Sequence, residues 1–221
     1  MSAMPIEERA QTLGEEIANA VSHGIGFLLA AASLPVLVQF ASRQGGGAAG
    51  VVAASIFAAS MMLLYLVSTL YHALPAGRAK QWFNRLDHAA IYVFIAGSYM
   101  PWLLGALRGP WGWSLFGVVW GAAALGVAAK LLDRLRHPLW STGLYVAMGW
   151  VAVVAIVPLV ERVGGAGLAW LVAGGVAYTL GALVFLLDNR IRYAHFVWHL
   201  FVIAGSACHF CAALWHASAL S

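Results

Sequence analysis

Long apolar stretches alternate along the chain with short polar or glycine- and proline-rich segments. Seven apolar runs occur, at approximately 20–42, 50–74, 88–107, 112–132, 139–160, 166–187 and 194–217. Each run is long enough to cross the hydrocarbon core of a bilayer as a helix. The pattern predicts an all-α integral membrane protein in which a bundle of seven transmembrane helices forms one domain over 20–221.

The composition supports this class of protein. Of the 221 residues, 62% are hydrophobic and only 9% are charged, whereas charged residues make up about a quarter of an ordinary globular domain. The formal net charge of +4 is spread over loops, which suits lipid headgroups better than nucleic acid. The two cysteines, Cys208 and Cys211, both lie in the last apolar run, so they imply no disulfide framework.

The first 19 residues are polar and carry several acidic side chains. A secretory signal begins with basic residues and a short apolar core, so this start does not fit one. We therefore expect residues 1–19 to remain as a cytoplasmic N-terminal segment.

The basic residues predict the orientation of the bundle, because the cytoplasmic loops of membrane proteins carry an excess of Lys and Arg. An N-terminus in the cytoplasm places nine of the twelve basic residues inside and leaves Arg43, Arg108 and Arg162 outside. The N-terminus is therefore expected in the cytoplasm and the C-terminus outside.

With this orientation, polar residues from three predicted helices fall at one depth. The second run ends with Ser68 and His72, the third begins near Asp87, and the seventh begins with His195 and His199. All five lie within about two helical turns, or roughly 10 Å, of the cytoplasmic boundary. His195 and His199 are four residues apart and so share one face of a helix. Ionisable groups inside a membrane span are costly, and they usually indicate function.

Three imidazoles and a carboxylate at one depth have the composition of a catalytic zinc site. We predict one Zn²⁺ ion held by His72, His195 and His199, with water in the fourth position. Asp87 would lie beside the ligands or take a proton from the bound water, and Ser68 would hydrogen-bond an imidazole, the water or a substrate oxygen. A histidine taken alone more often hydrogen-bonds across helices, so the agreement in depth is what favours a metal site.

The other histidines are predicted to have packing or interfacial roles. His88 points about 100° away from the preceding aspartate on a helix, which fits helix packing or contact with headgroups. His209 lies ten residues beyond His199, roughly 15 Å along a helix, and is too far away to bind the same metal. His137 in a basic cytoplasmic turn and His216 at the outer end are expected to be solvated or interfacial.

A second polar group precedes the first apolar run. Glu16, Asn19 and His23 fall on one helical stripe that begins on the cytoplasmic side. The stripe fits either a solvated amphipathic approach to the membrane or a cover over the polar layer, and the sequence leaves both interpretations open.

Three short motifs occur in order along the chain: EEIANAVSHGIGFL at 15–28, STLYH at 68–72 followed by Asp87, and HFVWH at 195–199. They resemble the motifs of the hemolysin III family, the bacterial branch of the progestin and adiponectin receptor (PAQR) family within a wider ceramidase-like superfamily. The resemblance covers nearly the whole chain and implies seven helices in the same order. It also implies the inner (plasma) membrane of a bacterium as the location.

For the site, the resemblance implies a zinc ion near the cytoplasmic face, held by the three predicted histidine ligands, with Asp87 close to its water. In the adiponectin receptors such a centre is linked to hydrolysis of a ceramide amide. The function expected from residues and resemblance together is a membrane-embedded zinc-dependent hydrolase acting on an amide or ester bond of a lipid. The expected partner is accordingly a membrane lipid, as substrate or ligand.

Two other functions stay open at this point. One is a sensor or homeostasis protein in which a zinc ion ties helices together without chemistry, which requires four protein ligands. The other is a membrane-lytic protein of the hemolysin type. The predicted polar residues gather at one end of the bundle and do not line a path across it, which argues against a pore.

Overall fold

The computed structural model describes residues 9–135 and 137–217, which form helices and no strand. The α-helices are α1 (Leu13–Arg43), α2 (Gly47–Ala73), α3 (Arg78–Leu104), α4 (Pro110–Leu131), α5 (Pro138–Gly149), α6 (Ile156–Phe185) and α7 (Ala194–His216). A short 3-10 helix, η1 (Val151–Ala155), joins α5 to α6. The all-helical prediction is confirmed for these residues, while residues 1–8 of the predicted N-terminal segment lie outside the described ranges.

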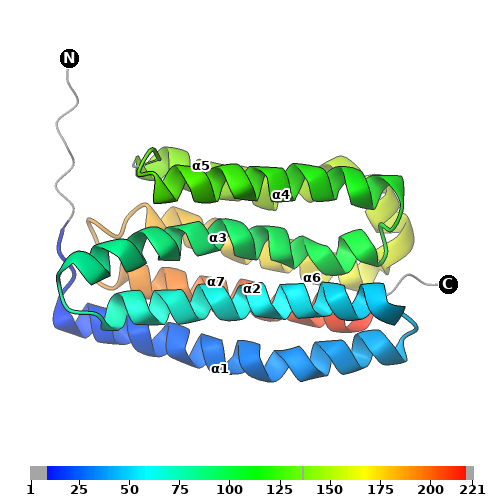
Figure 1. The fold of residues 1–221 in the computed structure, drawn as a ribbon, viewed down its shortest axis with the longest axis horizontal. Helices are drawn as coiled ribbons and strands as arrows, with labels where there is room; N and C mark the ends of the chain where they lie inside the picture. The colour runs from blue at the N-terminus through cyan, green and yellow to red at the C-terminus, as the bar shows by residue number, and fades with distance from the viewer. Residues whose placement is uncertain (1–8, 136, 218–221) are drawn as a thin grey trace, which may run out of the picture.

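The helices lie side by side, with their axes along the longest dimension of the molecule (Figure 1). α1 packs against α2 and α7, α3 packs against α2 and α4, and α6 packs against α7. One end of the bundle collects the beginnings of α1, α3 and α7 together with the end of α2 (Figure 1, left). We call this end, which is marked by Leu13, Ala73, Arg78 and Ala194, the site end.

Five stretches of the described chain are long and apolar enough to cross a membrane. They are Leu13–Arg43, Gly47–Ala73, Pro110–Leu131, Pro138–Phe185 and Ala194–His216. Large apolar side chains such as Leu28, Leu125 and Trp140 are exposed on their outer surfaces. An apolar exterior suits lipid, and helices satisfy their own backbone hydrogen bonds there. The chain is therefore an integral membrane protein.

α1 begins at Leu13, before the apolar run that starts near residue 20, and so includes the predicted helical stripe from Glu16. Thr12 is the N-cap: its side-chain oxygen accepts a hydrogen bond from the Glu15 backbone N–H, and the Glu15 carboxylate accepts one from the Thr12 backbone N–H at 2.9 Å. This reciprocal capping box satisfies backbone donors that would otherwise have no partner at the helix start. The second half of the polar N-terminal segment is therefore helical from Leu13 onward.

The region expected to contain the fifth and sixth runs is one long helical stretch with two interruptions. The 48 residues from Pro138 to Phe185 would extend about 72 Å as a straight helix, more than twice the thickness of a bilayer core. The first interruption is η1. The second is Gly164, whose φ of 73° and ψ of 165° break α6, in a conformation that favours glycine.

Close packing joins α1 to α2 and α7, the two helices that carry the three predicted histidine ligands. A Cβ atom on Gly26 of α1 would lie 2.8 Å from the Tyr65 ring of α2, so only glycine allows this approach. The Tyr65 hydroxyl in turn lies 2.8 Å from the Ser206 hydroxyl of α7. These contacts hold α1, α2 and α7 together just inside the site end.

Candidate metal centre

Three predicted ligands, His72, His195 and His199, come together at the site end. Each offers a ring nitrogen, and the three nitrogens lie within 4.8 Å of one another. The exposed fractions of the three residues are 3%, 7% and 0%. The expected convergence of α2 and α7 at one depth is therefore present in the fold, and the three residues could hold a metal ion.

The neighbours of His72 and His195 determine which ring nitrogen carries the proton. Nδ1 of His72 lies 2.8 Å from Glu16 Oε2, and Nδ1 of His195 lies 3.1 Å from Asp188 Oδ2. An ionised carboxylate can only accept a hydrogen bond, so both Nδ1 atoms donate. The Nε2 atoms of both rings therefore keep a free lone pair.

A serine sets the same tautomer in His199. Nδ1 of His199 lies 3.1 Å from Ser22 Oγ, while the Ser22 hydroxyl donates to the carbonyl oxygen of Asn19 at 2.9 Å. Because the hydroxyl proton is already used, Ser22 Oγ accepts from Nδ1 of His199. Partners of this kind orient metal-binding imidazoles and raise their basicity.

The Nε2 atoms of His72, His195 and His199 are all buried and have no hydrogen-bond partner. A buried nitrogen without a partner is costly, and three of them side by side in an apolar bundle need a common explanation. Imidazole nitrogen is a preferred ligand of zinc, copper, iron and nickel. The donor set therefore fits a transition-metal ion, and no carboxylate belongs to this group among the described residues.

Glu16 links the centre to the first turn of α3. Its Oε2 atom accepts from His72, and its Oε1 atom lies 2.9 Å from Lys80 Nζ. Lys80 also donates to the carbonyl oxygens of Tyr71 and Leu74 at the end of α2. The carboxylate that orients His72 is therefore itself held in place by a cation.

The segment from Arg9 to Asn19, which includes the start of α1, covers the site end. Glu15, which is 2% exposed, lies 2.6 Å from Arg9 Nη2 and accepts a hydrogen bond from the Tyr193 backbone N–H at 2.9 Å. The hydrogen bond to Glu15 raises the pKa of Arg9 above its ordinary value. Asn19 is fully buried and donates to Gln11 Oε1 at 2.6 Å.

Of the two interpretations of the stripe formed by Glu16, Asn19 and His23, the structure favours the cover over the polar layer. Asn19 and His23 are 0% and 2% exposed, which is incompatible with a solvated stripe. Glu16 hydrogen-bonds a predicted ligand directly. The stripe is therefore part of the centre.

His23 joins the three ligands to the other predicted site residues. Its ring lies flat on that of His199, with centroids 3.4 Å apart and planes 8° from parallel. Its Nδ1 atom is 2.7 Å from Ser68 Oγ. Asp87 is 3% exposed and lines the same cavity as His23. Ser68 and Asp87 therefore lie beside the centre, while their catalytic roles stay predictions.

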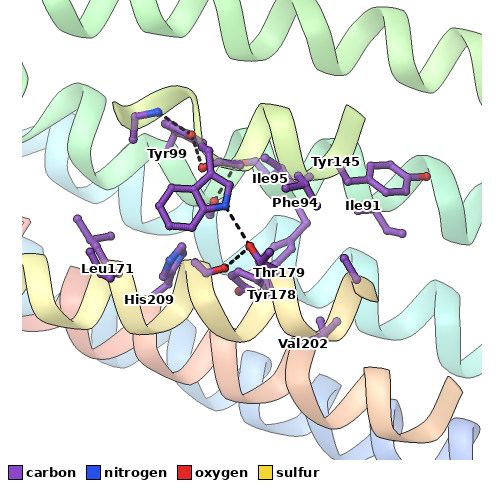
Figure 2. A pocket seen from close by; sticks show the side chains of 18 of the residues that line it. Ile91, Phe94, Ile95, Tyr99, Tyr145, Leu171, Tyr178, Thr179, Val202 and His209 are labelled. Carbon is purple, nitrogen blue, oxygen red and sulfur yellow. Dashed lines mark hydrogen bonds between the residues drawn. The ribbon is translucent and has the colours of Figure 1, made fainter. Parts of the chain in front are cut away.

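A cavity of about 200 Å³ begins next to these residues and runs along the bundle. Asp87 and His23 line it at the site end, and on α3 its lining continues to Trp102, about 22 Å further along the helix. Figure 2 shows part of its lining, to which α3 contributes Phe94 and Tyr99 and α6 contributes Leu171 and Tyr178. The cavity is thus a long apolar channel with polar groups at the metal end.

Two other histidines pack between helices, as the sequence indicated. Nδ1 of His88 lies 2.8 Å from the Asn84 carbonyl oxygen, and the His88 ring contacts the Phe185 ring. His209 packs edge-on against Tyr178 and does not belong to the three-histidine group.

Sequence reasoning missed two partners of the ligands, Asp188 and Ser22. Asp188 is a lone acid at the end of an apolar run, seven residues before His195, and that isolation was a usable signal. Ser22 immediately precedes His23 and carried no signal of its own, because its role depends on how α1 is rotated against α7.

The fold and the site define a helical membrane protein with a buried three-histidine candidate metal centre at one end. Residues 11–210 match the family described as Haemolysin-III related, and the chain belongs to this family. It is similar to Hemolysin-3 of Bacillus cereus, with 44% identity over 206 residues that cover 93% of each chain. A Hemolysin-3 homolog of Bacillus subtilis is 42% identical over 205 residues, covering 93% of this chain and 95% of that one.

A more distant relative extends the resemblance to the receptor branch. The Adiponectin receptor protein of Drosophila melanogaster is 26% identical over 160 residues, covering 63% of this chain and 35% of the receptor. The family assignment made from the three motifs is thereby confirmed.

Proposed function

We propose that this protein is a membrane-embedded, zinc-dependent hydrolase that cleaves an amide or ester bond in a lipid near the cytoplasmic face. The observation that carries the proposal is the set of three buried Nε2 atoms without partners, on His72, His195 and His199, beside a long apolar cavity. A structural zinc site is closed by four protein ligands, whereas a catalytic site keeps one position open. The described residues offer three ligands in this group, which favours the catalytic alternative.

In the proposed reaction, some residues of the site hold the metal ligands and others act on the substrate. Bound zinc would lower the pKa of a water molecule and polarise a substrate carbonyl. Glu16, Asp188 and Ser22 hold the ligand rings in position through their Nδ1 atoms. Asp87 accepts a proton as general base, and the Ser68 hydroxyl orients the reacting groups or donates to the developing oxyanion.

The cavity supports a lipid as the substrate. Its walls are apolar and aromatic, and its polar end is formed by His23, Asp87 and Thr142. A lipid placed with its acyl chain along the cavity would present its amide or ester linkage to Asp87 and the neighbouring centre. An apolar chain would replace water in a space that offers few hydrogen bonds.

The topology that we propose has seven crossings, with the N-terminus in the cytoplasm of a bacterial cell and the protein in its inner membrane. The break at Gly164 supports two crossings within Pro138–Phe185, a stretch too long for one. α3 lies between α2 and α4, antiparallel to both and with its axis aligned with theirs, despite its polar start (Figure 1). Arg78, Lys80 and Arg85 stand at the site end, which supports a cytoplasmic location for the centre.

The experiment compares wild-type protein with His199→Ala and Asp87→Asn, each purified in detergent micelles. Elemental analysis measures bound zinc, and turnover is followed with a fluorescent ceramide and a fluorescent phospholipid ester. We expect about one zinc per wild-type chain, loss of zinc and turnover in His199→Ala, and a fall in turnover of at least about 100-fold with zinc retained in Asp87→Asn.

Two results would overturn the proposal. Stoichiometric zinc in His199→Ala would contradict the ligand assignment. Fully zinc-loaded wild-type protein without turnover of either lipid class would leave the structural-zinc alternative in its place.

A further inference from the structure

A second polar position lies deep inside the cavity, at His209. This residue follows His199 by ten positions on α7, or roughly 15 Å along the helix. Its side chain points from α7 past α6 into the cavity, as Figure 2 shows. The surroundings at this depth are mainly apolar and aromatic.

The packing around His209 fixes its ring. A Cβ atom on Gly174 of α6 would lie 2.6 Å from His209 Nε2, so the absence of a side chain at Gly174 lets the ring pass α6. On its other side the ring meets Tyr178 edge-on, with centroids 5.3 Å apart. The Tyr178 hydroxyl is itself held at 3.1 Å from Ser206 Oγ. The imidazole is therefore placed by the fold and not free to turn away.

One nitrogen of this ring lacks a partner. Nδ1 of His209 is buried and has no hydrogen-bond partner among the described residues. An imidazole nitrogen accepts a hydrogen bond in one tautomer and donates one in the other, and a hydroxyl group can pair with either. A polar atom buried in an apolar space without a partner is costly, and this favours a ligand that supplies one.

Other polar groups at the same depth are already paired. The Trp150 indole N–H donates to Thr179 Oγ1 at 3.0 Å, and the Tyr99 hydroxyl donates to the Gly149 carbonyl at 2.7 Å. Among the described residues that line the cavity, buried side-chain atoms without a partner occur on His23, Thr142 and His209. The first two lie at the metal end of the cavity. His209 is therefore the one residue of the three that lies deeper in the cavity.

We propose that the cavity selects acyl chains that carry a hydroxyl group in their distal half, and that this hydroxyl forms a hydrogen bond with Nδ1 of His209. This inference rests on the proposed function for its assignment of a lipid to the cavity. One leaflet contributes about half of a hydrocarbon core roughly 30 Å thick. His209 lies about 15 Å along α7 from the metal ligand His199, so it would meet the distal part of an acyl chain whose linkage lies at the metal centre. An unsubstituted chain would leave Nδ1 unpaired, whereas a hydroxyl there would satisfy it.

The test measures binding of three free acids, the products that a lipid amide or ester hydrolase would release. Octadecanoic, 2-hydroxyoctadecanoic and 12-hydroxyoctadecanoic acids are titrated calorimetrically into the zinc-loaded protein in detergent. We expect the 12-hydroxy acid to bind about five- to tenfold more tightly than the other two, the usual effect of one buried hydrogen bond. The 2-hydroxy acid controls for added polarity alone.

Two variants separate His209 from the rest of the cavity. His209→Phe keeps an aromatic ring but no acceptor, and should bind all three acids with nearly equal affinity. His209→Gln keeps an acceptor and should retain part of the preference. Zinc content and thermal melting show whether each variant is folded. If a variant does not fold, the comparison of the three acids in the wild-type protein still tests the inference.

Equal affinities in the wild-type protein, or a preference that survives in His209→Phe, would overturn the inference. So would the failure of all three acids to bind. Binding requires no turnover, so a wild-type protein that prefers the 12-hydroxy acid but hydrolyses no lipid would refute the proposed function and leave this selectivity standing.

Discussion

The ring of His23 lies flat against the ring of His199, with centroids 3.4 Å apart and planes 8° from parallel. His199 is a candidate metal ligand, and His23 also hydrogen-bonds Ser68 on the neighbouring helix α2. A residue from the first helix thus fixes the orientation of a ligand on the last.

This stack predicts how the centre responds when His23 is changed. His23→Ala should weaken zinc binding about tenfold, because the His199 ring loses its support. His23→Phe keeps a flat ring and should weaken binding less. Competition with a coloured chelator measures both affinities, and equal effects of Ala and Phe would show that stacking is not what positions His199.

Removal of the carboxylates behind the ligands should weaken the centre. Glu16→Gln and Asp188→Asn replace acceptors of the Nδ1 protons of His72 and His195, and we expect each to lower zinc affinity by about 10- to 100-fold. Glu161→Gln, an exposed carboxylate on α6, is the matched control and should bind zinc like the wild type. The same chelator competition applies, and unchanged affinity in both variants would remove these carboxylates from the centre.

Zinc should stabilise the protein only through these ligands. Anything that binds the folded but not the unfolded state raises stability by mass action. A chelator in excess should therefore lower the melting temperature of the wild-type protein in detergent and leave that of His199→Ala unchanged. If both proteins shift equally, the chelator acts elsewhere.

The ion pair between Arg9 and Glu15 should contribute to closing the site end. Glu15→Ala removes the acceptor of the Tyr193 N–H and the partner of Arg9, and we expect a loss of about 1–3 kcal/mol in the free energy of unfolding. Arg9→Ala should cost less, because Glu15 keeps its backbone donors. A double-mutant cycle gives the coupling energy, and a value near zero would mean that the pair contributes nothing.

Gly174 should tolerate no side chain. A methyl group there would collide with the His209 ring, and Gly174→Ala is expected to cost about 1–3 kcal/mol through overpacking. Gly121→Ala on α4 is the control, since nothing lies within 4 Å of a Cβ atom at that position. Thermal unfolding of both variants checks the difference, and equal stability would contradict the placement of His209.

The sequence predicted the three-histidine group because the position of a residue within a predicted transmembrane helix gives its depth in the membrane. His72 near the end of one apolar run and His195 at the start of another had to meet at one end if the helices alternate in direction. The same reasoning predicts Asp87 and Ser68 beside them. Ser68 hydrogen-bonds His23, and Asp87 lines the same cavity as His23, while their catalytic roles stay predictions.

Features that depend on rotation and local capping were not predicted. Ser22 meets His199 because of how α1 is turned, and Asp188 reaches His195 from the segment that precedes α7. Both relations depend on side-chain directions that periodicity does not give. The helical stripe from Glu16 was predicted, but not the capping box between Thr12 and Glu15 that starts α1 at Leu13. The cavity could not be predicted from the sequence of any single helix, because residues from several helices line it.

The distribution of the donors over α2 and α7 has a consequence for biosynthesis. When α2 has been synthesised, His72 is the one candidate ligand of the three that the growing chain contains. His195 and His199 are synthesised with α7, so the three-histidine group cannot form until that helix has been made. Until then the carboxylate of Glu16, synthesised earlier, is available to hold His72 in the orientation that the finished centre requires.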